Sequence, residues 1–126
     1  MREKKKWMMA AAAVVGAVTG RICYECRHFT TEYYDVASDK IPEAFEGFRF
    51  VVLSDLHNYD FDQGNRQLLG AIERLKPDAV MIAGDMIDAH PGADMSAAVR
   101  MVRDLCDRWP VYFGNGNHEQ RIALYP

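Results

Sequence analysis

Cysteine is scarce in this sequence, and basic side chains are scarce in its main body. The 126 residues contain three cysteines, too few for the disulfide framework of a small secreted domain. Two of them form a lone Cys23-x-x-Cys26, without the second ligand pair that a structural zinc site requires. Residues 31–126 carry nine Lys or Arg against sixteen Asp or Glu, which excludes the clustered positive charge of a nucleic-acid-binding surface. The length allows one domain with a modest core, and the acidic body suits cation binding.

Long apolar runs are also missing, except near the N-terminus. Arg2 and Lys4–Lys6 precede an uncharged run from Trp7 to Gly20. A membrane span needs about 20 apolar residues and a signal-peptide core about 7–15. The run therefore predicts a hydrophobic helix that is a signal anchor, a cleaved signal or an ordinary buried helix. The absence of a clear cleavage site favours the anchor. The basic residues would keep the N-terminus in the cytoplasm, so the chain after the apolar run would lie outside the cytoplasm.

Three short stretches rich in β-forming residues predict a core sheet. Phe48–Ser54 contains the run Phe50–Leu53, which is apolar on both faces, as in a central covered strand. The other two core strands are expected over residues 79–83 and 111–113. Alternating residues predict one further strand before them, over residues 30–36.

Two stretches between the core strands have apolar residues at helical spacing. The first predicts a helix over residues 65–76, which Pro77 ends. The second, capped by Asp94 or Ser96, is expected to reach Arg108. The order β-α-β-α-β predicts an α/β fold with parallel strands and right-handed crossovers.

Polar side chains follow each core strand at its carboxyl end. In an open α/β sheet these ends share one edge, where ligands bind, so residues distant in the sequence are expected to converge there. Carboxylate, imidazole and amide groups form a mixed ligand set that suits divalent Mn, Fe, Zn or Ni. The residues are Asp55 and His57 after the first strand, Asp85 and Asp88 after the second, and Asn117, His118 and Glu119 after the third.

The three clusters, Asp-x-His, Gly-Asp-x-x-Asp and Gly-Asn-His-Glu, occur in this order and each after a strand. In this they resemble the calcineurin-like metallophosphoesterases, over about residues 48–119. The apolar N-terminal segment and the lead-in Lys40–Phe48 are similar to the membrane-associated bacterial branch of that family. The resemblance implies the β-α-β-α-β half of a layered α/β sandwich over residues 31–126, after an anchor and juxtamembrane segment over residues 1–30.

The resemblance also implies a role for each residue of the clusters. Asp85 would bridge two divalent metal ions, and a metal-bound hydroxide would attack phosphorus. His118 would be the catalytic residue that contacts the substrate phosphate and assists the leaving group. The other implied roles are Asp55 and His57 as ligands of the first metal, Asn117 as ligand of the second, and Asp88 and Glu119 as partners that orient ligating groups.

The implied activity is hydrolysis of phosphodiesters or phosphomonoesters, with a small-molecule or lipid-linked substrate. The protein would be membrane-anchored, with its catalytic domain outside the cytoplasm. The family pattern continues with a further His and Gly-His-x-His, whereas this chain ends at Pro126. We therefore expect a truncated domain, the N-terminal part of a longer enzyme, which alone binds metal weakly and lacks appreciable activity. The alternative is an inactive membrane-tethered remnant that acts as a binding module.

Overall fold

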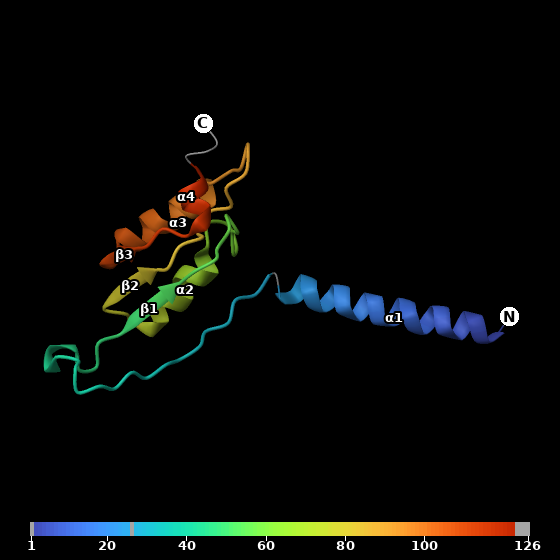
Figure 1. Cartoon of the computed structure of the whole chain (residues 1–126), viewed down its shortest axis with the longest axis horizontal. Helices are drawn as coiled ribbons and strands as arrows, with labels where there is room; N and C mark the ends of the chain where they lie inside the picture. Colours follow the sequence, from blue (N-terminus) through green and yellow to red (C-terminus); the bar gives the residue numbers. More distant parts are fainter. Residues whose placement is uncertain (1, 26, 123–126) are drawn as a thin grey trace. The chain divides into compact units, whose positions relative to one another are not determined.

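The computed structural model describes residues 2–25 and 27–122, and the chain divides into two compact units, residues 1–35 and 36–126. The first unit is built around one long helix, α1 (Arg2–Glu25), drawn in blue in Figure 1. Its stretch Lys4–Glu25 is long and apolar enough to cross a membrane, by length and composition. Cys23 is exposed, and Cys26 lies outside the described residues.

The strand expected over residues 30–36 is not formed, and that prediction was wrong. The segment has no regular secondary structure, and Tyr33, Tyr34 and Val36 are all strongly exposed. A strand needs a neighbour that completes its backbone hydrogen bonds, and no strand among the described residues runs beside this one. Residues 38–47 are largely irregular, with one 3-10 turn, Glu43–Phe45.

The second unit contains, within its described residues, a parallel three-stranded sheet in the order β1-β2-β3. This confirms the α/β class and the β-α-β-α-β order. A short helix after the third strand was not predicted. The elements are β1 (Phe50–Leu53), α2 (Arg66–Leu75), β2 (Ala79–Ile82), α3 (Ser96–Cys106), β3 (Val111–Phe113) and α4 (Asn117–Arg121).

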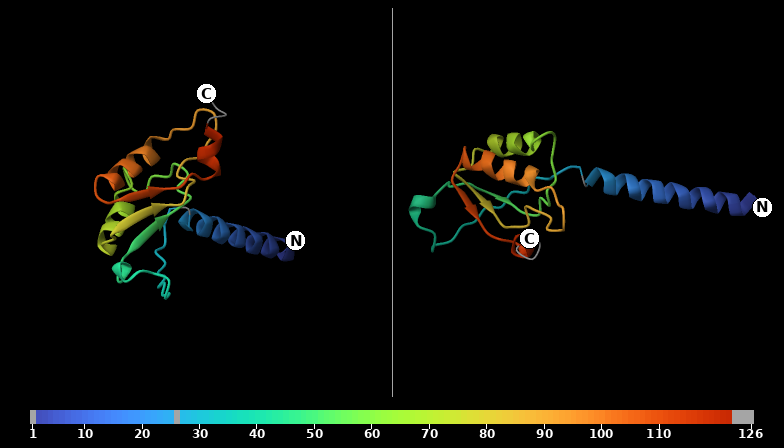
Figure 2. Two further views of the ribbon diagram at one scale, coloured as in Figure 1. Left: turned by 60° about the vertical axis from the view of Figure 1, so that its left-hand side comes forward. Right: turned by 90° about the horizontal axis from the view of Figure 1, so that it is seen from above.

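Helices α2 and α3 both cover the same face of the sheet, as the right-hand view of Figure 2 shows. The core lies between them and the central strand β2, and its apolar side chains are excluded from water. Burying each such side chain contributes roughly 1.5–3 kcal/mol. The most deeply buried apolar side chains of this core include Val80 on the sheet, Ile72 on α2, and Met101 and Leu105 on α3.

Along the three strands, the opposite face of the sheet is largely exposed. Val52, Met81 and Tyr112 stand in register across the three strands and are 62%, 41% and 61% exposed. The expectation that the run Phe50–Leu53 forms a central strand covered on both faces was therefore wrong. β1 is an edge strand, and its apolar residues are covered on one side alone.

The helix ends lie close to the predicted positions. Lys76 takes a left-handed conformation (φ 50°) directly before Pro77 and ends α2. The Asp94 carboxylate accepts a hydrogen bond from the Ser96 N–H at 2.9 Å, at the start of α3. That helix ends at Cys106, two residues before the predicted Arg108.

Candidate metal centre

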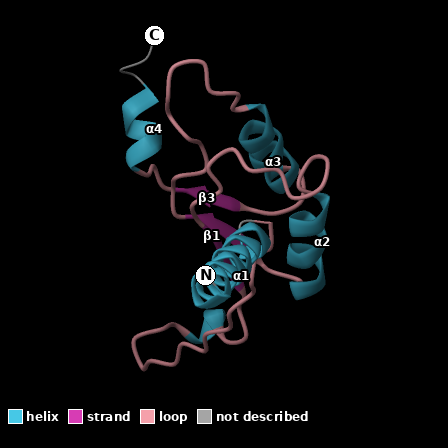
Figure 3. Ribbon diagram, turned by 90° about the vertical axis from the view of Figure 1, so that its right-hand side faces the viewer, coloured by secondary structure: helices cyan, strands magenta, loops and turns pink. Residues whose placement is uncertain are grey.

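The carboxyl ends of the three strands open onto one edge of the second unit. The sheet ladder continues past the strand ends, since the Ala83 N–H donates to the Leu53 carbonyl and the Gly114 N–H to the Ile82 carbonyl, both at 2.8 Å. Helix α4 lies on the other side of the sheet from α2 and α3 (Figures 2 and 3). The loops after β1, β2 and β3 are therefore neighbours, as the topology predicts.

Backbone hydrogen bonds join the first of these loops to the second. Three amide donors of the β1 loop find carbonyl acceptors in the β2 loop, so the two loops extend the strand pairing without being strands. This pairing fixes the spacing between the Asp-x-His and Gly-Asp motifs. The pairs are Asp55 N–H to Gly84 O at 3.2 Å, His57 N–H to Asp85 O at 3.1 Å, and Asn58 N–H to Met86 O at 3.0 Å.

Three candidate ligands lie on strained backbone. Asp55, His57 and Asp85 have φ angles of 59°, 47° and 53°, in the left-handed region that non-glycine residues rarely adopt. Each such residue costs about 1–2 kcal/mol. Strain of this kind persists where the surrounding structure enforces it, and it gathers at ligand-binding and active sites.

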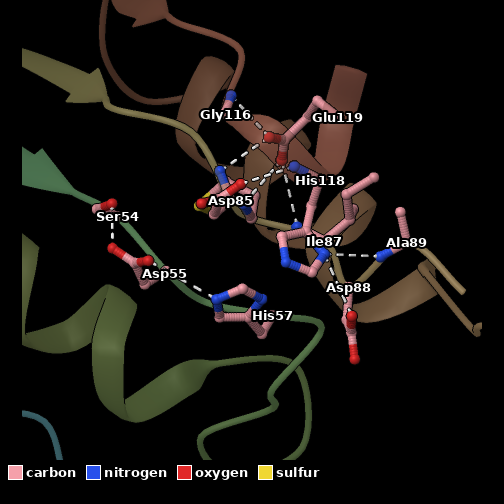
Figure 4. Close-up of polar contacts among 11 residues, drawn as sticks. Ser54, Asp55, His57, Asp85, Ile87, Asp88, Ala89, Gly116, His118 and Glu119 are labelled. Atoms are coloured by element: carbon pink, nitrogen blue, oxygen red, sulfur yellow. Dashed lines mark hydrogen bonds and ion pairs between the residues drawn. The ribbon is translucent and has the colours of Figure 1, made fainter. Parts of the chain in front are cut away.

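These three side chains converge. One ligand atom from each of Asp55, His57 and Asp85 lies within 4.8 Å of the other two. The His57 Nε2 is 3.7 Å from the Asp55 Oδ1, and the Ser54 hydroxyl donates a hydrogen bond to the Asp55 Oδ2 (Figure 4). Two carboxylates and an imidazole at this spacing match the donor set of a divalent transition metal.

Asn117 brings an amide group to the same place. In its hydrogen-bonding orientation the amide nitrogen lies 2.9 and 2.6 Å from the two Asp85 carboxylate oxygens and donates to them. Asn117 is therefore a direct neighbour of Asp85, and a half-turn of the amide would offer its oxygen to a cation beside that carboxylate.

His118 lies beside these ligands. Its Nδ1 accepts a hydrogen bond from the Ala89 N–H at 3.1 Å and is 3.2 Å from the Asp88 Oδ1. A ring nitrogen that accepts an amide hydrogen leaves the proton of neutral histidine on Nε2. The His118 ring meets the His57 ring edge-on at 4.7 Å (Figure 4). His57, Asp88 and His118 also form a second group with ligand atoms within 4.8 Å.

Glu119 holds the β2 loop to the start of α4. Its Oε2 accepts hydrogen bonds from the N–H groups of Asp85 and Gly116 at 2.8 Å, and its Oε1 accepts from Met86 at 2.8 Å and Ile87 at 3.3 Å (Figure 4). Partial burial raises the pKa of Glu119, but these backbone donors outweigh it and hold the pKa below its ordinary value. A carboxylate that is ionised at neutral pH thus positions Asp85.

Two glycines permit this close packing. A Cβ added to Gly84, whose φ is +97°, would lie 2.3 Å from the Gly116 nitrogen. A Cβ added to Gly116 would lie 2.3 Å from the Asp85 Oδ1. The backbone of the Gly-Asp motif and that of the Gly-Asn-His-Glu motif therefore touch, which only glycine allows.

All seven residues singled out in the sequence lie around this edge, although none of their chemical roles is tested by geometry alone. Asn58, Ser54 and the Ala89 amide were missed. The Asn58 Nδ2 donates to the Asp88 carbonyl at 3.4 Å. Ser54 and Asn58 flank the Asp-x-His motif, and this adjacency is the one signal that could have found them. The Ala89 contribution is made by its backbone and carries no sequence signal.

Comparison with known proteins supports the same assignment. The model of the family described as calcineurin-like phosphoesterase matches residues 48–126. The chain belongs to the calcineurin-like phosphoesterase family. The match covers all three loops of the site and begins just before β1. The membership confirms the resemblance seen in the motifs, while the bacterial branch stays a prediction.

One curated relative of this phosphoesterase chain is a protein of Danio rerio named "Transmembrane protein with metallophosphoesterase domain". It is 31% identical over 91 residues, which are 71% of this chain and 21% of that protein. The chain thus spans about a fifth of the length of the curated relative it matches. No solved structure matches it significantly.

Proposed function

We propose that this chain carries part of a metal-dependent phosphoester hydrolase that works with two divalent ions. Asp55 and His57 would hold one ion, Asp85 would bridge both, and Asn117 would hold the second through its oxygen. The metals, of the Mn, Fe, Zn or Ni type, would polarise the phosphoryl oxygens and lower the pKa of a coordinated water. The substrate is a phosphodiester or phosphomonoester, either a small molecule or lipid-linked.

The observation that carries the proposal is the convergence of acceptors on strained backbone. Asp55, His57 and Asp85 bring their ligand atoms within 4.8 Å of one another from left-handed conformations. The Asn117 amide lies against the Asp85 carboxylate. Two carboxylates and an imidazole gathered on strained backbone are a donor set for a divalent cation, so the arrangement is best explained as a binding site.

In this proposal His118 is the catalytic residue and binds no metal. The Ala89 amide keeps the proton of neutral His118 on Nε2, where it can be donated to a phosphate or a leaving group. The Asp88 Oδ1 lies 3.2 Å from the His118 Nδ1. Glu119 and the four amides that it accepts from keep Asp85 in position.

The first unit is proposed to anchor the protein in a membrane. Support comes from α1, whose Lys4–Glu25 stretch is long and apolar enough to span, and from the name of the Danio rerio relative. The basic residues before the apolar run favour a cytoplasmic N-terminus and a catalytic domain outside the cytoplasm. The domain division, an anchor with its juxtamembrane segment over residues 1–30 and a phosphoesterase domain over residues 31–126, belongs to the same proposal.

The test separates metal binding from catalysis in the protein expressed from its complete gene. Bound Mn²⁺ and turnover of a chromogenic phosphodiester are measured for His118→Ala and Asp85→Asn. His118→Ala should lower turnover about 10²–10⁴-fold, the usual value of acid–base assistance, and keep its metal. Asp85→Asn should lose both metal and turnover, because it removes the bridging charge.

Two exposed residues outside the three motifs provide matched controls. His28→Ala and Asp39→Asn should keep the metal content and the turnover of the wild type. Equal loss of metal in His118→Ala and Asp85→Asn would show that the role of His118 is wrong. A protein that binds metal and phosphate tightly but hydrolyses neither diesters nor monoesters would instead be the tethered binding module.

A further inference from the structure

Helix α1 has apolar side chains on all sides. Trp7, Met9, Val15 and Tyr24 are each more than half exposed, and at about 100° per residue they point to four different sides of the helix axis rather than along one stripe. A helix that docks in a protein groove needs one apolar face, whereas one that is apolar all round is surrounded by an apolar medium. A lipid bilayer is such a medium.

The charges of α1 are confined to its ends. Exposed Lys4, Lys5 and Lys6 precede the apolar run. At the other end Arg21 is paired with Glu25, Nε to Oε1 at 2.7 Å, one helical turn apart. Lysines beside an apolar helix complement anionic lipid headgroups, and the paired Arg21 carries less unbalanced charge into the span.

Aromatic residues flank the uncharged run: Trp7 is its first residue, and Tyr24 lies one helical turn beyond Gly20, just past Arg21. The long Arg21 side chain can extend toward the interface beside Tyr24. Trp7 is 74% exposed and Tyr24 is 57% exposed, and the Tyr24 ring stacks on His28 at 3.9 Å. Trp and Tyr prefer the two membrane–water interfaces. At 1.5 Å rise per residue, Trp7 and Tyr24 are about 26 Å apart along the helix axis. A typical hydrocarbon core is about 30 Å thick, and membranes differ by several ångströms around that value.

We infer that α1 is matched to a thin bilayer, with a hydrocarbon core of about 26 Å, and holds its lysines in an anionic leaflet. This rests on the proposed membrane anchoring. A helix longer than the membrane can tilt, but a short one cannot gain length by tilting. A thicker membrane must thin locally around α1 or draw its ends inward, each at a free-energy cost.

The experiment uses the full chain with Trp109→Phe, so that Trp7 is its one fluorescent tryptophan. The chain is reconstituted into phosphatidylcholine vesicles containing phosphatidylglycerol, with monounsaturated acyl chains that lengthen stepwise from myristoleoyl to erucoyl. Resistance to carbonate extraction reports insertion, and quenching by shallow and deep brominated lipids reports the depth of Trp7. Insertion should be greatest in the thin vesicles and about tenfold lower in the thickest.

A lengthened anchor is the matched control. Inserting Leu-Ala-Leu-Ala after Val15 adds about 6 Å and should move the optimum to thicker vesicles by that amount. Equal insertion of both chains at every thickness, with Trp7 always at the interface, would overturn the match while leaving the anchoring intact. Extraction of both chains from all vesicles would overturn the anchoring itself.

Discussion

Replacing Glu119 by alanine should loosen the candidate site while leaving the sheet and its two covering helices formed. The carboxylate accepts four backbone hydrogen bonds, three of them at 2.8 Å. A hydrogen bond to a charged group contributes about 1.5–3 kcal/mol, and such values are not additive. Because the variant leaves several amides without a partner, we expect a loss of about 3–5 kcal/mol in the free energy of unfolding.

Urea denaturation of the full chain, followed by circular dichroism, measures this loss, and Glu73→Ala is the control. Glu73 is exposed on α2 and lies 3.9 Å from the Arg108 guanidinium, an exposed pair worth well under about 1 kcal/mol. Hydrogen exchange should locate the loosening of Glu119→Ala at residues 84–88. A loss no larger than that of Glu73→Ala would refute the positioning role.

The pH dependence of the same variant gives an independent reading. The pKa of Glu119 is held below its ordinary value, because its backbone donors outweigh the partial burial that raises it. A carboxylate with a lowered folded-state pKa stabilises the protein above its unfolded-state pKa, about 4.3. That contribution is lost as the pH falls through the folded-state pKa. The stability difference between the wild type and Glu119→Gln should therefore be constant near neutral pH and shrink below about pH 4.3.

Two further predictions concern the loops. Gly84→Ala should destabilise the protein by about 2 kcal/mol or more beyond Gly92→Ala. Both glycines have positive φ, but of the two only Gly84 would bring a new Cβ against backbone, at 2.3 Å from the Gly116 nitrogen. Equal urea midpoints of the two variants would contradict this close contact. Asp60→Ala should cost about 1–2 kcal/mol, since the Asp60 carboxylate accepts hydrogen bonds from the N–H groups of Gly64 and Asn65, and proteolysis should then cut the β1–α2 loop faster than in the wild type.

The sheet was predictable because its signals are local and agree with one another. The segments around Phe50, Val80 and Val111 are apolar and β-branched or aromatic, and each is separated from the next by a helical pattern. The strand expected over residues 30–36 failed for the opposite reason. Tyr33 and Val36 have strand propensity, but propensity forms no strand without a neighbour that accepts its hydrogen bonds.

The covering of the sheet could not be read from composition. The run Phe50–Leu53 is apolar at every position, and such a run suggests helices on both faces. The structure puts α2 and α3 on one face and leaves Val52 at 62% exposure on the other. An apolar side chain favours burial, but the connections between the strands decide which element buries it.

The candidate site was predictable in its members but not in its supports. Asp55, Asp85 and Asn117 could be brought together from topology alone, because parallel strands end at one edge. These supports are backbone groups: the Ala89 amide donates to His118, and the Met86 and Ile87 amides donate to Glu119. Their positions depend on the loop conformation, which sequence spacing does not specify.

The local energetics of this edge connect metal binding to folding. Three ligands lie in left-handed conformations that each cost about 1–2 kcal/mol, and their ligand atoms lie within 4.8 Å of one another. The compensating contacts come from Glu119, from the close approach of Gly84 and Gly116, and from the hydrogen bonds between the β1 and β2 loops. Leu56 and Met86 of these loops are also buried, at 7% and 2% exposure, so the core helps to hold the loop geometry. A cation bound only by the folded arrangement would add its binding free energy to the stability of these loops. The binding free energy of a cation would thus offset the cost of the left-handed conformations that bring its ligands together.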